Sequence, residues 1–216
     1  MSTDTKQVVT EEKPVEEKPV EEKPVEEKPV EEKPAAKPAA KPAAKPAAKP
    51  VELPAFEKSI SDKVVEKFGD KIQVEFVKEN RVGIKVNRED VHDVAEFIRD
   101  GLNYDHVESV SGVDYPQDKE IEVVYHIGSY SDSSLAKQIL VLATRAQREE
   151  NPIPGKDATK LPTLRDIFYS VEFHEREVFE MFGVYFTGHP DNRRLLLPED
   201  WADLPPLRKD FAIKGR

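Results

Sequence analysis

The run HERE at residues 174–177 is the densest group of chemistry-bearing side chains in the sequence. A histidine followed by a glutamate begins a zinc-protease motif, in which a second histidine four residues later puts both imidazoles on one helical face. Position 178 is Val178, so the second zinc ligand is absent. Paired carboxylates for acid–base chemistry remain open on residue type alone, with Glu175 beside Glu177 or Glu180.

No other residue pattern predicts a cofactor or metal site. The five histidines, at positions 92, 106, 126, 174 and 189, lack the short spacing of a metal site. The patterns GxGxxG, GxxxxGK(S/T) and GxSxG do not occur. The absence of cysteine excludes thiolate-held iron–sulfur clusters, cysteine zinc sites, a thiol nucleophile and disulfides. We therefore expect no catalytic, cofactor-binding or metal-binding residue in this chain.

The segment around this run combines charged and aromatic residues at helical spacing. Glu172, Arg176 and Glu180 follow one another at i,i+4, which predicts a ladder of alternating charge on one face. The flanking residues are apolar, namely Phe173, Val178, Phe179, Met181 and Phe182. Since little of so short a helix is left for water, we expect the charges to be partnered at an interface or in a half-buried network.

The helix and strand patterns of residues 54–183 predict an α+β domain, and this domain would position the charged helix. Helical spacing indicates two earlier helices, one in SISDKVVEKFG after Leu53-Pro54 and one from Arg88 to about Asp100, capped by Asn87 and stopped by Gly101. Strand patterns occupy 72–77, 81–86, 107–115, 121–130 and 138–145, the first two forming a hairpin. This order predicts a mostly antiparallel sheet with helices packed on one face. The charged helix itself is expected from about Ser170 to Gly183.

Residues 184–216 predict an extended, irregular C-terminal segment. Glycines and prolines interrupt any regular element, yet the segment is rich in leucine and carries Trp201 and Phe211. A segment of this kind needs a surface against which to bury its apolar groups. We expect that surface to belong to another subunit.

Residues 1–53 predict a disordered, low-complexity tail. EEKPV repeats are followed by AAKP repeats, and a proline every fourth or fifth residue blocks helices and sheet ladders. The formal charge of −10 disfavours a nucleic-acid reader, because phosphate contacts need a clustered basic surface. No apolar run is long enough to span a membrane, and the first residues do not have the pattern of a signal peptide.

The stretch from His174 to Phe211 closely resembles the signature of the 30 kDa subunit of the NADH-quinone oxidoreductases, which is the C subunit of respiratory complex I. The resemblance covers roughly residues 55–216 and leaves out the repeats. Phe168 and Phe173 stand where the family commonly has tryptophan, and Asp203-Leu204-Pro205 replaces a Gly-His-type step. The matching residues are Glu175, Arg176, Glu177, Phe182, Gly183, Gly188, His189, Pro190, Arg194, Leu195, Leu196, Pro198, Asp200, Trp201, Pro206, Leu207, Arg208, Lys209 and Asp210.

The resemblance implies a non-catalytic structural subunit in the hydrophilic arm of a proton-translocating NADH-quinone oxidoreductase. Its partner would be the hydrogenase-like large subunit next to the quinone site. Flavin, iron–sulfur clusters and quinone would belong to partner subunits. The chain would lie at the cytoplasmic face of the membrane, attached only through the complex. The interface residues expected on this basis are Glu175, Arg176, Glu177, Gly183, Gly188, His189, Pro190, Arg193, Arg194, Leu195, Leu196, Trp201, Leu207, Arg208, Lys209, Asp210 and Phe211.

Three alternatives remain open at the level of the sequence. The chain could be the equivalent subunit of a related ferredoxin-, deazaflavin- or hydrogen-linked membrane complex. It could be a hydrolase in its own right that uses Glu175 or Glu177. It could also be a free-standing interaction module tethered by the repeat tail.

Overall fold

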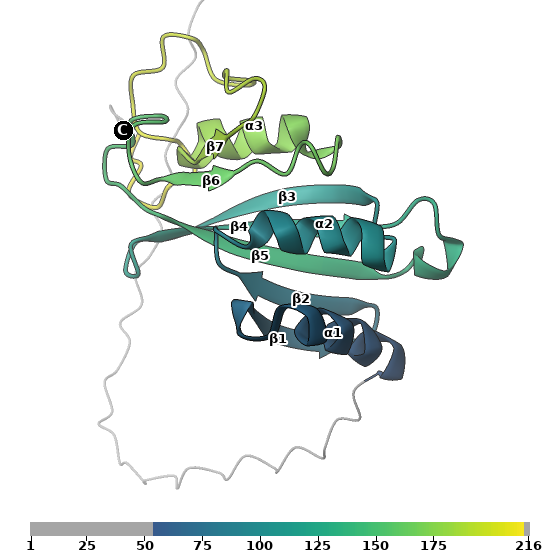
Figure 1. The fold of residues 1–216 in the computed structure, drawn as a ribbon. Coiled ribbons are helices and arrows are strands. Elements are labelled where there is room, and N and C mark those ends of the chain that lie inside the picture. The colour runs from purple at the N-terminus through teal and green to yellow at the C-terminus, as the bar shows by residue number, and fades with distance from the viewer. Residues whose placement is uncertain (1–53, 214–216) are drawn as a thin grey trace, which may run out of the picture. The chain divides into compact units, whose positions relative to one another are not determined.

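A computed structural model describes residues 54–213. The predicted disordered tail at residues 1–53 and the last three residues lie outside this described part. The described residues fold as an α+β domain with a five-stranded, mostly antiparallel sheet and three helices (Figure 1). This confirms the predicted fold class.

The five strands of the main sheet are joined in the spatial order β1-β2-β5-β4-β3. All neighbours are antiparallel except β2 and β5, which are parallel. The parallel pair is possible because a helix and the β3–β4 hairpin lie between the two strands in the chain and return it to the same end of the sheet. The strands are β1 (Ile72–Lys78), β2 (Arg81–Val86), β3 (His106–Tyr115), β4 (Glu120–Gly128) and β5 (Ile139–Gln147).

The three helices lie on the same side of the sheet and enclose one hydrophobic core with it (Figure 1). They are α1 (Ala55–Phe68), α2 (Val91–Leu102) and α3 (Val171–Phe182). In the central strands the side chains that face the helices are fully buried at alternate positions, as in Ile121, Val123 and Tyr125 of β4. Two short 3₁₀ turns, Gly69–Lys71 and Ser133–Leu135, complete this part of the fold.

Helix α1 begins earlier than the sequence pattern indicates. It starts directly after Pro54, whose fixed φ suits a helix entry and whose carbonyl accepts the first helical bond, from the amide of Lys58. Ser59, the first residue of the sequence pattern, is a cap candidate by type, but it lies inside the helix and donates its hydroxyl proton to the carbonyl of Phe56. Glu57, buried in the first turn, accepts a hydrogen bond from the amide of Asn80 and holds α1 to the β1–β2 turn.

Helix α2 is shifted toward the C-terminus relative to its predicted range. Residues 88–90 form a turn in which the amide of Asp90 donates to the carbonyl of Asn87, so the helix begins at Val91. It continues through Gly101 and ends at Asn103, which has a φ of 61°. Asparagine tolerates this left-handed conformation, and its amide closes the last turn onto Ile98.

The segment after β5 supplies a second, two-stranded sheet, whose Leu161 and Phe186 join the same hydrophobic core. In it β6 (Lys160–Pro162) pairs in parallel with β7 (Tyr185–Thr187), which follows α3. Residues 188–213 contain no helix or strand. We call residues 188–213 the C-terminal strap; it runs beside α3 (Figure 1).

Candidate partner-binding site

Helix α3 is the element that carries the predicted site. Val171, Val178 and Phe182 are buried and orient the helix on β3. Phe182 lies so close to Gly112 of β3 that an added Cβ would be 2.5 Å from the ring, so only glycine permits this approach. The helix ends, as predicted, at Gly183, whose φ of 78° is the left-handed conformation of a helix C-cap.

Glu175 is the fully buried acid of this helix. Its carboxylate accepts hydrogen bonds from the hydroxyl of Tyr125 (3.2 Å), the hydroxyl of Thr163 and the amide of Leu164 (2.9 Å). Burial raises the pKa of Glu175 to about 7, although these donors act in the opposite direction. The carboxyl group therefore joins α3 to β4 and to the loop after β6, and it has no open side for a substrate.

His189 lies at the start of the strap and is also buried. Its Nε2 donates to the carbonyl of Glu172 (3.1 Å), and its Nδ1 accepts from the amide of Asp191 (3.0 Å). These two bonds fit the neutral imidazole with the proton on Nε2. Although Nε2 is 3.9 Å from a carboxylate oxygen of Glu175, this arrangement is that of a structural histidine rather than of an ion pair.

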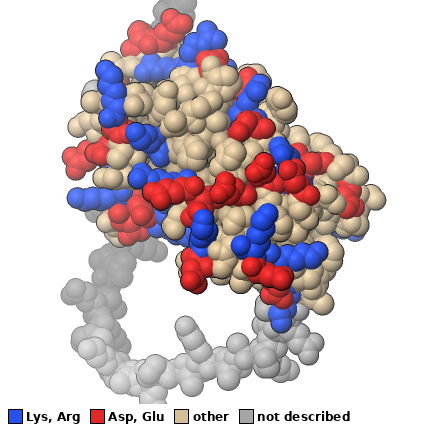
Figure 2. Space-filling view, in the orientation of Figure 1, with Lys and Arg blue, Asp and Glu red and all other residues tan. Residues whose placement is uncertain are grey.

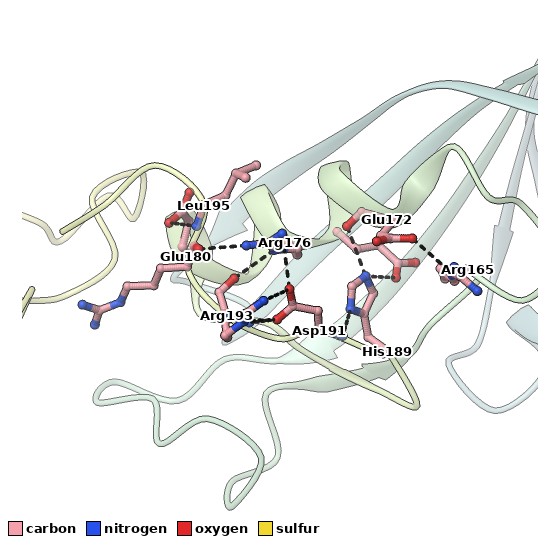
Figure 3. A network of polar contacts seen from close by, with 10 residues as sticks. Arg165, Glu172, Arg176, Glu180, His189, Asp191, Arg193 and Leu195 are labelled. Atoms are coloured by element: carbon pink, nitrogen blue, oxygen red, sulfur yellow. Dashed lines mark hydrogen bonds and ion pairs between the residues drawn. The ribbon is translucent and has the colours of Figure 1, made fainter. Parts of the chain in front are cut away.

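The predicted ladder of Glu172, Arg176 and Glu180 is wrong, because each of these side chains bonds elsewhere (Figure 3). Glu172 pairs with Arg165 at 3.1 Å. Arg176 donates to the carbonyls of residues 193 and 194, at 3.0 and 2.9 Å. Glu180 accepts from the amides of residues 195, 196 and 197. The charges do form a half-buried network, but Arg176 and Glu180 bind the backbone of the strap and Glu172 binds Arg165, instead of one another.

The strap adds further bonds of its own beside this network. Arg194 donates to the carbonyls of Pro198 and Trp201 at 2.8 and 2.7 Å, and also to that of residue 199. Asp191 accepts from both the backbone and the side chain of Arg193, and these bonds, with the nearby Arg176, lower the pKa of Asp191 to about 2. The segment thus has a defined conformation without any regular secondary structure.

Near its C-terminal end, the strap places the side chain of Arg208 in the interior of the domain. Arg208 is 2% exposed and donates from Nε to the carbonyl of Phe182 (2.7 Å) and from Nη1 to the carbonyl of Glu149. Beside it, Asp114 binds the guanidinium of Arg148 (2.6 Å) and the amide of residue 209. Burial lowers the pKa of Arg208, with a further contribution from the charge of Arg148.

The predicted interface residues therefore fall into two groups. One group is turned inward and holds the strap to α3 and the sheet: Glu175, Arg176, Gly183, His189, Arg194 and Arg208. Asp210 is exposed but is paired with the buried Arg148 at 2.7 Å. Trp201 and Phe211 are half-buried against each other, with ring centroids 6.0 Å apart. The other group is exposed: Glu177, Gly188, Pro190, Arg193, Leu195, Leu196, Leu207 and Lys209.

The exposed group includes the apolar side chains that a partner would need. Leu195, Leu196 and Leu207 are 40%, 63% and 55% exposed. On the adjoining helix, Phe173 is 58% exposed, with the guanidinium of Arg176 5.8 Å from its ring centroid. Whether these side chains meet a partner stays a prediction.

Three contributors to this site are not among the expected interface residues. The sequence pattern assigns Glu180 to the charge ladder and to a possible carboxylate pair with Glu175, and it gives Asp114 and Arg148 no role. Asp114 follows Val110 and Gly112 at alternate positions of β3, and such an inward-facing acid in a strand is a sequence signal for a buried ion pair. The binding of Glu180 to three backbone amides has no comparable signal, because any residue supplies an amide.

Within residues 54–213, no group of three or more histidine, aspartate or glutamate side chains is arranged to hold a metal ion. In the same range, no helix has the length and hydropathy needed to cross a membrane. The face shown in Figure 2 carries lysine and arginine interspersed with aspartate and glutamate, rather than a patch of one sign.

Comparison with known proteins identifies the family. Residues 84–216 match the family described as "Respiratory-chain NADH dehydrogenase, 30 Kd subunit". The chain belongs to this family. The resemblance that the residues from His174 to Phe211 indicated is thereby confirmed.

Two relatives of this 30 kDa subunit family show how broad it is. The chain is 35% identical over 131 residues to the C subunit of the F(420)H(2) dehydrogenase of Methanosarcina mazei, covering 61% of this chain and 75% of the relative. It is also 35% identical over 156 residues to the C subunit of the NADH-quinone oxidoreductase of Chlorobium phaeobacteroides, covering 71% and 87%.

Among solved structures, a chain of the membrane-bound sulfane sulfur reductase, an archaeal respiratory membrane complex, has a similar fold. The TM-score is 0.58 at 27% sequence identity, and the match covers 73% of this chain and 86% of that one. The 30 kDa subunit fold thus occurs in respiratory complexes with different names.

Proposed function

We propose that this chain is a non-catalytic structural subunit in the hydrophilic arm of a proton-translocating quinone oxidoreductase, where it binds the hydrogenase-like large subunit next to the quinone site. The observation that carries this proposal is the strap. Its backbone is bonded by Arg176 and Glu180 of α3, while Leu195 and Leu196 remain exposed. Exposed leucines on an ordered segment are suited to burial against another protein.

One relative supports the choice of partner. The chain is 35% identical over 128 residues to the C/D subunit of the NADH-quinone oxidoreductase of Phocaeicola vulgatus, of which it covers 22%. That name describes a protein in which the C and D subunits are joined in one chain. Subunits joined in one chain lie near each other, and this supports the D subunit, which we take to be the large subunit, as the neighbour of the present chain.

NADH is the proposed electron donor, and a deazaflavin or another donor is the alternative. The named relatives include an F(420)H(2) dehydrogenase and a sulfane sulfur reductase as well as NADH-quinone oxidoreductases. Because similar chains serve complexes with different names, the contribution they share is expected to be independent of the donor. This supports a structural role rather than a catalytic one.

We place the cofactors of the complex in partner subunits. The sequence contains no cysteine and therefore cannot hold an iron–sulfur cluster through thiolates. Glu175, the strongest candidate for acid–base chemistry, is buried and bonded to three donors, which argues against the hydrolase alternative. The chain is placed at the cytoplasmic face of the membrane, attached through the complex.

The proposal is tested by purifying the tagged full-length chain from detergent-solubilised native membranes and identifying the co-purifying subunits by mass spectrometry. We expect the hydrogenase-like large subunit, and the accompanying subunits will identify the electron donor. Replacing both Leu195 and Leu196 with aspartate should reduce recovery of the large subunit at least ~10-fold, because two charges would have to be buried in the interface.

The matched control is Val65→Asp, which changes an aliphatic side chain of similar exposure on α1, at the other end of the domain. This variant should recover the large subunit as well as the wild type does. Recovery of the wild-type chain alone, or equal losses for both variants, would contradict the proposed role.

A further inference from the structure

Glu180 has an unusual set of partners for a buried acid. Its side chain belongs to a residue that is 5% exposed, and among the described residues it accepts bonds from backbone amides rather than from a cation. The amides of Leu195 and Leu197 donate to Oε2 at 2.9 and 3.1 Å, and the amide of Leu196 donates to Oε1 at 2.8 Å. Hydrogen bonds to an ionised carboxylate are among the stronger ones in proteins.

Three consecutive amides that converge on one carboxylate determine the direction of the side chains between them. The backbone bends at residues 195–197, with the N–H groups on the side of α3 (Figure 3). The side chains of Leu195 and Leu196 are consequently left 40% and 63% exposed. Leu197 instead lines a cavity of about 560 Å³ between residues 151–154 and the strap.

Arginine side chains also bind the backbone before and after the bend at residues 195–197. Arg176, one helical turn before Glu180, donates to the carbonyls of residues 193 and 194. Arg194 donates to carbonyls at 198, 199 and 201, beyond the bend. The two leucines are thus presented from an ordered backbone, so little further ordering is needed when a partner binds.

We propose that Glu180 is the positioning residue of the partner interface: it builds a projecting pair of leucines, Leu195 and Leu196, that inserts into an apolar pocket of the large subunit. This inference rests on the proposed function and adds to it the residue that shapes the contact. A protruding apolar pair fits a concave apolar surface of a protein, and an ordered, desolvated centre of this kind is where binding energy concentrates. Glu180 itself does not touch the partner.

The first measurement is residue-resolved hydrogen exchange of the full-length chain, wild type against Glu180→Gln. The glutamine amide offers one acceptor oxygen and turns an NH₂ group toward the remaining N–H donors. The amides of residues 195–197 should therefore exchange at least ~10-fold faster in this variant. Glu177→Gln is the matched control, because Glu177 is an exposed carboxylate on the same helix, and it should leave these amides unchanged.

The second measurement is a double-mutant cycle on affinity for the large subunit, expressed together with this chain. Glu180→Gln alone should weaken binding about tenfold. In a chain whose Leu195 and Leu196 are already alanine, the same change should have no further effect, since Glu180 acts only through those side chains. Thermal unfolding of each variant shows whether the domain is retained.

Additive losses in the cycle, or unchanged exchange at residues 195–197, would overturn the inference. Absence of binding by the wild-type chain would overturn the proposed function and the insertion of the leucine pair together. The two failures are distinguishable, because failure of the Glu180 inference alone leaves wild-type binding intact.

Discussion

Glu175 shows how strongly a single side chain depends on its position in this fold. Its carboxyl group is completely buried and has three hydrogen-bond donors, while the imidazole of His189, 3.9 Å away, makes its own bonds to the backbone. Desolvation exceeds the effect of the donors, and the pKa of Glu175 rises to about 7. The folded protein therefore holds a proton here that the unfolded chain releases at lower pH.

This shift predicts a specific dependence of stability on pH. The folded pKa of Glu175, about 7, lies above its unfolded value of 4.5, so the folded state binds more protons between the two. The contribution of Glu175 to the free energy of unfolding is complete below pH 4.5 and is lost as the pH rises to 7, by roughly 3 kcal/mol. Denaturant unfolding of wild type and Glu175→Gln across this range measures it.

The glutamine variant keeps the shape of the side chain and does not titrate. We expect the difference in stability between wild type and variant to change by this amount between about pH 4.5 and 7 and to be constant above about pH 8. A difference that is independent of pH would show that Glu175 is ionised throughout. Other carboxyl groups, such as Asp191 with its lowered pKa, cancel because both proteins contain them.

At the scale of helices and strands, the sequence pattern predicts correctly those features that depend on neighbouring residues. The β1–β2 hairpin follows from alternation around its turn, and α3 ends at Gly183, where a glycine is needed for a positive φ. The parallel pairing of β2 with β5 was not predicted, because the two strands are separated by a helix and a hairpin. The end of α2 was also misplaced, because Asn103 rather than Gly101 adopts the left-handed conformation.

Gly183 allows a test of how much this helix end contributes to stability. An alanine there would keep a φ of 78°, and its Cβ would lie 2.9 Å from Pro152 and 3.1 Å from Nη2 of Arg208. Gly188, with a φ of 86° and only an ordinary 3.4 Å contact between an added Cβ and Thr163, offers a positive φ without the overlap.

We expect Gly188→Ala to lower the free energy of unfolding by about 1 kcal/mol, the effect of the positive φ alone. Gly183→Ala should lower it by roughly 2–4 kcal/mol, since overpacking is added. Chemical denaturation of both variants measures the difference. Equal losses would show that residues around Pro152 move aside at no cost.

At the scale of the whole molecule, the strap behaves as part of the domain. Sequence reasoning placed its leucines, arginines and Trp201 against another subunit, yet most of its charged groups bond within this chain. The reason is physical: Arg176, Glu180 and Arg208 bind backbone groups, which every residue possesses and which leave no pattern in the sequence. Only the exposed subset remains available to a partner.

We therefore expect Arg208 to contribute to the stability of the folded domain. Arg208→Glu would bury a carboxylate against two carbonyls and close to Asp114, and we expect a loss of roughly 3–5 kcal/mol in the free energy of unfolding. Arg193→Glu, at a side chain that is 85% exposed, should leave the stability close to that of the wild type.

Thermal unfolding of the purified full-length variants provides this comparison. Arg208→Met separates packing from charge, because it keeps much of the volume without a guanidinium. Similar melting temperatures for the variants at 193 and 208 would mean that Arg208 is not bonded inside the domain in solution.

The attachment of the strap also sets an order of events during synthesis. The carboxylate of Asp114 in β3 accepts a hydrogen bond from the amide of Lys209, 95 residues later. The carbonyl of Met181 accepts one from the amide of Leu207. Residues 207–210 are synthesised after the sheet and α3, so these acceptors and the buried pair of Asp114 and Arg148 gain their last partners at the end of folding. A chain truncated before Leu207 would lack these hydrogen bonds. We expect it to fold incompletely and to be degraded faster by cellular proteases.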